Sequence, residues 1–312
     1  MLAFIVKRVL LAIPSLLAIS FLVFLVARLA PSGPVEIIAG DKATPAVVAQ
    51  LKHEYGLDKP VFVQYVNYVI GIATHGDLGK SFQRGGQPIT EMLRTDFPVT
   101  AQLAWQALLF AIIVGIPTGI LAALFHNSWF DRLAMLAVVA LVSVPSIVLG
   151  PLLIMVLALH LRWLPIDGWS SPMHTLLPTV TLGARSAAML ARFMRSSLLD
   201  VLRQDYIRTA IAKGYSRGRA VWKHGLKNAL LPVLTVMGTV FGALLSGSFV
   251  VETIFRVPGI GFESINSISK RDYPVIQGMA LLVAVLYIVI NIAIDVLYGV
   301  IDPRIRSQES PK

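Results

Sequence analysis

The chain has 312 residues, of which 56% are hydrophobic and only 14% are charged, and it contains no cysteine. Soluble domains carry about 25% charged residues, so this composition indicates an integral membrane protein. Without cysteine there are no disulfides, no thiolate metal sites and no cysteine nucleophile. A net charge of +10 is compatible with nucleic-acid binding. The basic residues, however, cluster in short segments beside apolar runs, which is typical of the cytoplasmic loops of membrane proteins, so we expect no nucleic-acid partner.

The N-terminal residues 1–29 are expected to form the first membrane-spanning helix. The run from Val9 to Ala27 is uncharged, follows Lys7 and Arg8, and contains Pro14. A span needs about 20 mostly apolar residues. The apolar part of a signal peptide is only about 7 to 15 residues long, so this run predicts a span that is not cleaved.

Residues 30–99 are too rich in charge to span a membrane and are expected to form a small extracytoplasmic subdomain. Thr44 is suited to cap a helix from Pro45 to Tyr55, and Gly56 is suited to end it. A second helix is expected from Pro60 to Ile70.

Residues 100–302 are expected to form the core, with five more spans, and residues 303–312 a cytoplasmic tail. The expected spans are Ala101–Phe125, Leu133–Leu161, His174–Ser196, Asn228–Val251 and Pro274–Ile294, the last continuing to Ile301. His174–Ser196 is the weakest by hydropathy because it contains Arg185. The expected fold class is therefore an all-α integral membrane protein with six transmembrane helices and a small extracytoplasmic α subdomain between helices 1 and 2.

Nine lysines and arginines lie between Arg192 and Lys227. Cytoplasmic loops carry an excess of positive charge, so this segment and both termini are expected to be cytoplasmic. Within it, Asp205 is suited to cap a short helix, with an apolar stripe formed by Ile207, Ala210 and Ile211. Ser197 and Asp200 look like a second capping pair. Gly214 is suited to end the short helix by adopting a positive φ.

The same segment resembles the coupling loop of binding-protein-dependent ABC transporter permeases. The resemblance is carried by Asp205-Tyr206-Ile207-Arg208-Thr209-Ala210, by Lys213-Gly214 and by Leu231-Pro232. The namesake glutamate of that loop is replaced here by Arg208, and the distance from Gly214 to Pro232 is long. Both departures resemble the peptide and nickel branch. Further segments agree with that branch: Gly56–Pro60, Gly76–Gly79, Trp163–Pro165, Val251–Phe255, Arg271–Tyr273 and Asp302–Arg304.

The resemblance implies a non-catalytic permease subunit of an importer for peptides or nickel complexes in the bacterial plasma (inner) membrane. The implied partners are a homologous second permease, two ATP-binding subunits that hold ATP and Mg²⁺, an extracytoplasmic substrate-binding protein and the lipid bilayer. Residues 197–227 would be the coupling segment that meets the ATPases. Its implied coupling residues are Asp205, Tyr206, Arg208, Thr209, Ala210, Lys213 and Gly214.

This chain is expected to bind no cofactor, nucleotide or metal itself. The segment Thr74–Ser81 resembles a phosphate-binding loop, but Thr74 stands where that motif requires glycine. The residues alone leave open that the helix ending at Gly214 lies on the bilayer surface instead of docking a partner. A sensor or scaffold, and a membrane-embedded enzyme, also remain open. For the enzyme, the uncharged spans offer no converging polar residues.

Three ionisable residues in or beside the spans are candidates for the pathway or for structural roles. Glu252 is expected to pair with Arg256. Asp295 is expected to anchor a helix, and either acid would be the proton site of a self-sufficient secondary transporter, the rival function. Arg185 would either meet a substrate carboxylate or play a structural part, because its burial requires a partner or a wet cavity. Gly238 and Gly242 predict a close helix contact, a candidate surface for the second permease.

Overall fold

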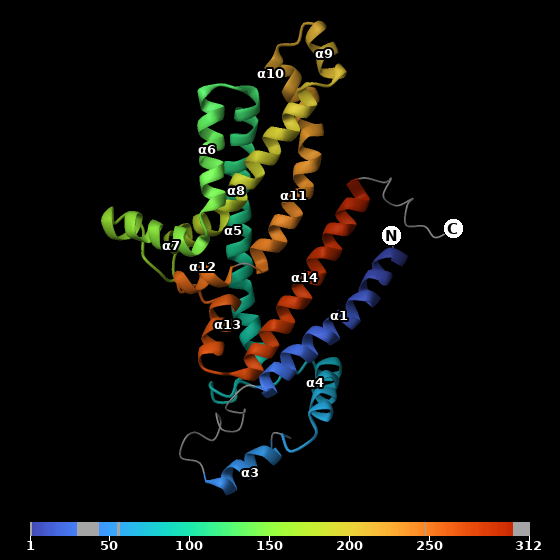
Figure 1. Cartoon of the computed structure of the whole chain (residues 1–312), viewed down its shortest axis with the longest axis vertical. Coiled ribbons are helices and arrows are strands. Elements are labelled where there is room, and N and C mark those ends of the chain that lie inside the picture. The colour runs from blue at the N-terminus through green and yellow to red at the C-terminus, as the bar shows by residue number, and fades with distance from the viewer. Residues whose placement is uncertain (1, 30–43, 55–56, 247, 302–312) are drawn as a thin grey trace. The chain divides into compact units, whose positions relative to one another are not determined.

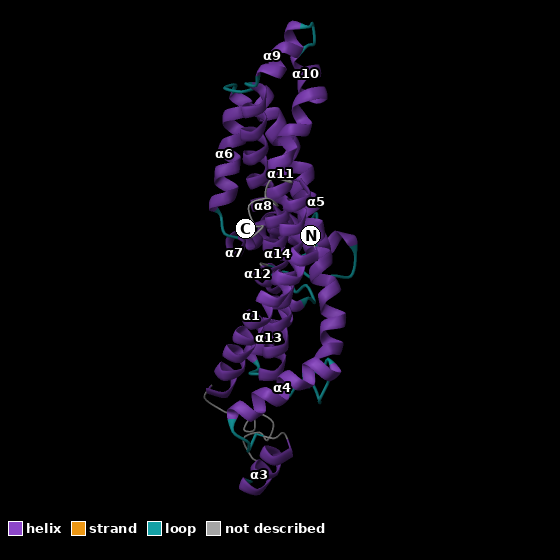
Figure 2. Ribbon diagram, turned by 90° about the vertical axis from the view of Figure 1, so that its right-hand side faces the viewer, coloured by secondary structure: helices purple, strands orange, loops and turns teal. Residues whose placement is uncertain are grey.

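The computed structural model describes residues 2–29, 44–54, 57–246 and 248–301. Helices joined by short loops make up nearly all of this part of the chain (Figure 2), and its only extended pairing is an isolated bridge between Lys80 and Pro88. The all-α prediction is confirmed. The expectations for residues 30–43, for Tyr55 and Gly56, and for the tail after Ile301 concern residues outside the described ranges. The chain divides into two compact units.

The first unit contains residues 1–99 and 258–289. Its helices are α1 (Leu2–Leu29), α3 (Pro45–Glu54), α4 (Val61–His75), the start of α5 (Ile89–Leu124), α13 (Ile260–Ser269) and most of α14 (Tyr273–Ile301) (Figure 1). Its buried core is formed by Ile89, Met92, Ile260, Val275 and Met279. Apolar side chains far apart in sequence therefore hold the start of α5 against α13 and α14.

Two predicted short helices are present in this unit. The first begins at Pro45 as expected, and the second continues past Ile70 to His75, where Gly76 adopts the left-handed conformation with φ 64°. Tyr65 of α4 donates a hydrogen bond to the Leu17 carbonyl of α1 at 2.8 Å, and its hydroxyl lies 2.8 Å from that of Ser20. These bonds fasten α4 to the first spanning helix.

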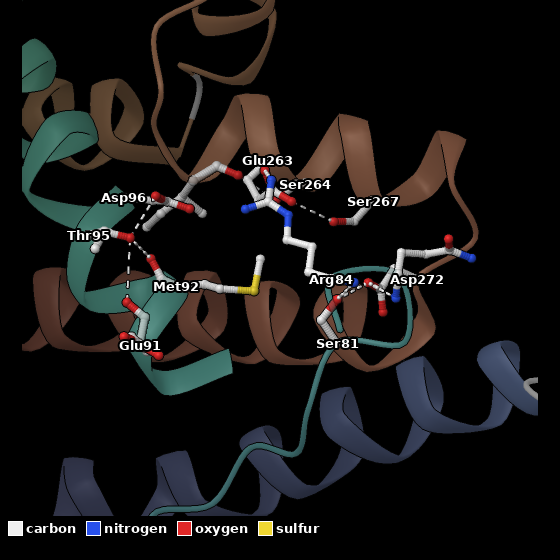
Figure 3. A network of polar contacts seen from close by, with 12 residues as sticks. Ser81, Arg84, Glu91, Met92, Thr95, Asp96, Glu263, Ser264, Ser267 and Asp272 are labelled. Carbon is white, nitrogen blue, oxygen red and sulfur yellow. Dashed lines mark hydrogen bonds and ion pairs between the residues drawn. The ribbon is translucent and has the colours of Figure 1, made fainter. Parts of the chain in front are cut away.

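The loop before α5 is held by a buried carboxylate, and we call this cluster the Asp272 latch (Figure 3). Asp272 accepts three hydrogen bonds, from Ser81 Oγ at 2.5 Å, Phe82 N at 3.1 Å and Gln83 N at 3.2 Å. Beside it, Arg84 forms an ion pair with Glu263 of α13, and Glu263 also accepts a hydrogen bond from Ser267 at 3.2 Å. The latch joins residues about 190 positions apart in sequence, as their separations of 189 to 191 show.

The second unit contains residues 100–257 together with the end of α14. After α5 it comprises α6 (Trp129–Ser143), α7 (Ser146–Leu153), the π-helix η1 (Ile154–His160), α8 (Pro172–Leu202), α9 (Asp205–Ala212), α10 (Arg217–Ala220), the π-helix η2 (Val221–Gly225), α11 (Leu226–Ser246) and α12 (Phe249–Ile254). α8 packs against α6, α7 and α11. α9 and α10 lie at the same end of this unit as the α5–α6 turn (Figure 1).

Glycines bring α5 and α8 into backbone contact. A Cβ added to Gly115 would lie 2.4 Å from the Ala187 carbonyl oxygen, and one on Gly119 would lie 2.4 Å from that of Ala191. The residue numbers in these contacts increase along both helices, so α5 and α8 run in the same direction. The segment between them therefore crosses back to the end where α5 began. The Gly115–Gly119 spacing is the small-residue pattern of packed spans, and it was present in the sequence but overlooked.

The sequence predicted one span from Leu133 to Leu161. The structure shows two segments with a bend between them. α6 ends at Ser143, and α6 and the α7–η1 pair are bent by 107°. Val144 is extended, with φ −87° and ψ 116°. The cause is Pro145, which lacks an N–H and disfavours the helical conformation in the residue before it.

Within the described residues, four helices are long and apolar enough to span a membrane, or five if the bent pair counts as one span. The four lie in α1, in α5, across residues 218–245 and in α14, close to four of the predicted spans. α11 ends at Ser246, earlier than the predicted Val251. The predicted span His174–Ser196 lies within the 31-residue α8, which has the length but not the apolar composition, so six spans are not confirmed.

Candidate functional site

The short helix predicted in the coupling segment is α9, Asp205–Ala212. The residue before it, Gln204, is the N-cap and makes no side-chain cap hydrogen bond, so the prediction that Asp205 caps the helix was wrong. Asp205 lies in the first turn, where its negative charge favours the helix dipole. Its carboxylate lies 3.7 Å from Arg208, and both side chains are largely exposed. Thr209 Oγ1 donates to the Asp205 carbonyl at 2.9 Å.

Gly214 ends α9 as predicted. Its φ is +91°, a conformation that residues with side chains rarely adopt. The Gly214 amide donates to the Ile211 carbonyl at 2.9 Å, and the Tyr215 amide to the Ala210 carbonyl at 3.2 Å. Nothing lies within 4 Å of the place where a Cβ would stand, so the glycine is required by the turn and leaves open space beside it.

One face of α9 is packed on its own chain. Ile207 and Ala210 are buried, and Ile207 contacts the region of Gly225 in η2, where Val201 of α8 also packs. Ile211, expected on the same stripe, is 43% exposed. Because α9 packs on the region of η2 and α8 around Gly225, two of its three apolar side chains are buried and the third is exposed. Ala210, one of the implied coupling residues, faces inward.

The opposite face of α9 is exposed and defines the candidate docking surface. Its members are Asp205, Arg208, Thr209, Ile211, Ala212, Lys213 and Gly214. Tyr206, which is 41% exposed, lies beside it, and its hydroxyl accepts a hydrogen bond from Asn228 Nδ2 of α11 at 3.0 Å. The structure therefore brings six of the seven predicted coupling residues to the surface, with Ala210 beneath them.

An ion pair between the buried carboxylate of Asp131 and the half-buried Arg195 supports this end of the unit. Arg195 of α8 donates from Nε to Asp131 Oδ1 at 2.6 Å and from Nη2 to Oδ2 at 2.8 Å. Asp131 also accepts from the Asn127 amide at 3.0 Å, and the Ser128 hydroxyl caps α6 by accepting from the Asp131 amide at 3.3 Å. The pair fastens the α5–α6 turn to α8. Sequence reasoning counted Arg195 only as positive charge, although the lone acid Asp131 between two apolar runs was a signal.

The predicted capping pair of Ser197 and Asp200 was wrong. Both residues lie inside α8, which continues to Leu202. The Ser197 hydroxyl donates instead to the Ala229 carbonyl of α11 at 2.8 Å. A tertiary contact thus uses the hydroxyl that local sequence had assigned to a helix start.

The predicted pair between Glu252 and Arg256 was also wrong. Glu252 is fully buried and accepts hydrogen bonds from Thr100 at 2.9 Å and from Ser248 at 2.5 Å. Arg256 instead lies 3.6 Å from Asp167 on the surface. The side chain of Asp295 falls outside the described part, so its role stays untested.

Arg185 is exposed on α8, and no ion pair or hydrogen bond joins its side chain to any described residue. The candidate contact at Gly242 is made within this chain, because a Cβ there would lie 2.9 Å from Ile290 of α14.

Several helices long and apolar enough to span a membrane, with the short exposed helix α9 between α8 and α11, fit a transport subunit of the membrane. Residues 115–307 match the family described as "Binding-protein-dependent transport system inner membrane component". Residues 1–104 match its N-terminal companion, "Binding-prot-dependent transport system membrane comp, N-term". The chain belongs to this family, in its peptide and oligopeptide importer branch.

Its curated relatives include the "Glutathione transport system permease protein GsiC" of Escherichia coli (strain K12) and of Salmonella typhimurium (strain LT2). Each is 44% identical over 306 residues, covering 98% of this chain and 99% of the relative. Two solved structures share the fold. A MetNI methionine ABC transporter in inward-facing conformations gives a TM-score of 0.58 at 18% identity, covering 68% of this chain and 97% of that chain. An amino acid ABC transporter gives 0.53 at 17% identity, covering 67% and 93%.

The protein is thus a transmembrane permease subunit of an ABC importer and not an enzyme, since ATP hydrolysis in this family belongs to partner subunits. The rival function, a self-sufficient proton-coupled carrier, is not supported. Membership implies a second permease, ATPases and a substrate-binding protein in general, and a multi-pass location in the inner membrane.

Proposed function

We propose that this permease imports glutathione or a closely similar small peptide. The observation that carries the proposal is 44% identity to glutathione permeases over 306 residues, which cover 98% of this chain and 99% of the relative. Such identity supports a common cargo, but a substrate-binding protein makes the first selection in importers of this kind, so the partner set must be tested together with the chain.

In this proposal the importer contains this chain, a homologous second permease, two ATPases that hold ATP and Mg²⁺, and an extracytoplasmic binding protein. Both termini and the coupling segment are cytoplasmic. The permease pair alternates between outward and inward access, and nucleotide shifts that equilibrium only through its different affinity for the two states. The chain itself binds neither nucleotide nor metal.

The exposed face of α9 is proposed as the ATPase docking surface. What supports it is the combination of a buried inner face, held by Ile207 and Ala210, with an outer face that carries Arg208, Ile211 and open space at Gly214. A helix of this size forms a small interface, below about 1,200 Å². If two permeases each bind one ATPase of a joined pair, the second contact forms at a high effective concentration. The full assembly is then more stable than a single contact.

Cargo is tested by uptake. The chain is co-expressed with its partner permease and ATPases in a host without glutathione permeases. Membrane vesicles are supplied with the binding protein, ATP and radiolabelled glutathione. We expect ATP-dependent uptake that unlabelled glutathione suppresses and a hexapeptide does not. ATP-dependent uptake of another solute, with none of glutathione, would contradict the cargo.

Docking is tested with Ile211→Glu and Gly214→Asp, each placing a carboxylate on the exposed face of α9. We expect recovery of the ATPases with the purified permease to fall at least about tenfold, on the order of 1.4 kcal/mol of binding. Membrane insertion should not change in either variant. The melting temperature should hold in Ile211→Glu and fall in Gly214→Asp, because a side chain at φ +91° strains the turn, so Ile211→Glu carries the stability control. Gly218→Ala is the matched control, since Gly218 lies in neighbouring α10 with nothing within 4 Å of its added Cβ. Normal ATPase recovery in both carboxylate variants would refute the docking surface.

A further inference from the structure

α8 presents a basic stripe. Its exposed or half-exposed face contains Arg185, Met189, Arg192 and Ser196, at spacings of 4, 7 and 11 residues from the first. At 100° per residue these positions lie on one side of the helix. The other side carries buried alanines, among them Ala184, Ala187, Ala188 and Ala191, packed on neighbouring helices. We call the four residues the α8 stripe.

The stripe begins at the depth of the membrane. Gly183 packs on Ala107 of α5, and Gly115 of α5 packs on Ala187, so Arg185 lies between two contacts with a spanning helix. Arg192 follows two turns later, about 10 Å further along the axis toward α9. A guanidinium at the depth of Arg185 is costly against lipid and marks a wet cavity, a pathway or a partner charge.

Among the described residues, a carboxylate contacts one arginine of α8 but neither of these two. Arg195 is paired in two hydrogen bonds with buried Asp131. Within the described residues, Arg185 has no anionic partner, and Arg192 only lies over the Phe193 ring at 5.9 Å. Both guanidiniums are therefore open to an anion from beyond the described residues.

We propose that the α8 stripe lines the translocation pathway and binds the carboxylates of the passing peptide, first at Arg185 and then at Arg192. This rests on the proposed function as a peptide importer. Every peptide with a free C-terminus carries a carboxylate, and glutathione carries two. The planar guanidinium binds a carboxylate through two parallel hydrogen bonds, which an ammonium does not reproduce. Two such sites about 10 Å apart allow the anion to pass from one to the next.

The environment of the stripe is tested by thiol labelling, which is clean because the chain has no cysteine. Met189→Cys keeps both arginines and is assembled with the second permease and ATPases in nanodiscs. Labelling of this chain by an anionic and by a cationic methanethiosulfonate is followed by mass. We expect both reagents to react with Met189→Cys. The anionic reagent should react at least about five times faster with Met189→Cys than with the double variant that also carries Arg185→Gln, because the Arg185 cation attracts it.

Leu136→Cys, on an exposed apolar position of α6, is the control that should react with a membrane-permeant maleimide and not with charged reagents. S-methylglutathione, which has no thiol, should slow labelling at residue 189, and its diamide should not. Labelling at residue 189 by the maleimide alone would place the stripe against lipid. No labelling by any reagent would place it against the second permease. Either result, or a rate unaffected by Arg185→Gln, overturns the proposal.

Transport separates this inference from the proposed cargo. In the reconstituted importer we expect Arg185→Gln to lower glutathione uptake at least about tenfold while ATP turnover stays within about twofold. Arg185→Lys should retain part of the uptake. Arg132→Gln, which replaces an exposed arginine of α6, should have no effect. Unchanged uptake in Arg185→Gln refutes the stripe. If the unsubstituted chain carries another carboxylate peptide instead, the cargo is wrong and the same variants retest the stripe with that peptide.

Discussion

The Asp272 latch and the outer face of α9 use charged residues in opposite ways. In the latch a buried carboxylate accepts three hydrogen bonds, and the neighbouring Arg84 is paired with Glu263. On α9 the charges of Asp205 and Arg208 are exposed and 3.7 Å apart. Buried, fully partnered charges stabilise this chain, whereas exposed ones are available to other molecules. The difference separates residues that maintain the fold from residues that are candidates for coupling.

The glycine contact between α5 and α8 also maintains the fold, and it leaves the least room for change. Gly119→Ala should therefore give the largest loss of stability. The added Cβ would lie 2.4 Å from the Ala191 carbonyl oxygen and 2.7 Å from Met194 Cβ, so the two helices must separate. Overpacking of this kind costs about 1–3 kcal/mol or more. We expect the melting temperature of the purified permease to fall by at least about 5 °C.

Gly218→Ala provides the comparison for that measurement, because the same methyl group there meets open space. Replacing glycine by alanine in a helix is favourable by about 0.5–1 kcal/mol, so the melting temperature should hold or rise. Equal losses in the two variants would mean that α5 and α8 are not in backbone contact.

Local chemistry was sufficient to predict α9 and its end. The acidic Asp205 in the first turn stabilises the start of α9, and Gly214 ends it. Both effects act within one or two turns, so they can be predicted from local sequence. The long apolar runs likewise predicted α1, α5 and α14, since hydropathy alone decides them. The 107° bend after Ser143 was missed because an uncharged run hides a break whose one signal is Pro145.

Tertiary partners explain the remaining misses. Nothing near Ser197 in the sequence indicates that its hydroxyl reaches Ala229, and nothing near Arg256 points to Asp167. Which face of α9 is buried depends on where η2 lies, so the exposure of Ile211 could not be read from the pattern of the helix. The candidate site was therefore located from sequence, but its inner and outer faces were not.

The next largest effect should come from Asp272→Ala. Removing the carboxylate leaves the buried Ser81 hydroxyl and the part-buried amides of Phe82 and Gln83 without this acceptor. An unsatisfied buried group costs about 1–3 kcal/mol. We expect faster hydrogen exchange at the amides of residues 81–84. Exchange at α9, in the other unit, should stay the same, and unchanged exchange at residues 81–84 would show that the latch does not hold this loop.

The pair of buried Asp131 and half-buried Arg195, beside the predicted coupling segment, allows the same comparison within one unit. Asp131→Asn keeps the size of the side chain but removes the charge that Arg195 contacts at 2.6 and 2.8 Å. Hydrogen bonds to charged groups contribute about 1.5–3 kcal/mol, and we expect a loss of that order in urea unfolding of the detergent-solubilised permease. A loss below about 0.5 kcal/mol would mean that water already screens the pair.

The smallest effect on stability should come from Arg208→Gln on the outer face of α9. Its pair with Asp205 is exposed at both ends, and such pairs contribute about 0–1 kcal/mol. Urea unfolding should therefore match the unsubstituted chain, while recovery of the ATPases falls if Arg208 meets them. Asp205→Asn removes the same pair from the other side and separates the two roles. If both variants lose ATPase equally, the pair shapes α9 for docking; if only Arg208→Gln does, the guanidinium itself contacts the ATPase. A stability loss as large as that of Asp131→Asn would mean that this face of α9 is packed in the working protein and that docking occurs elsewhere.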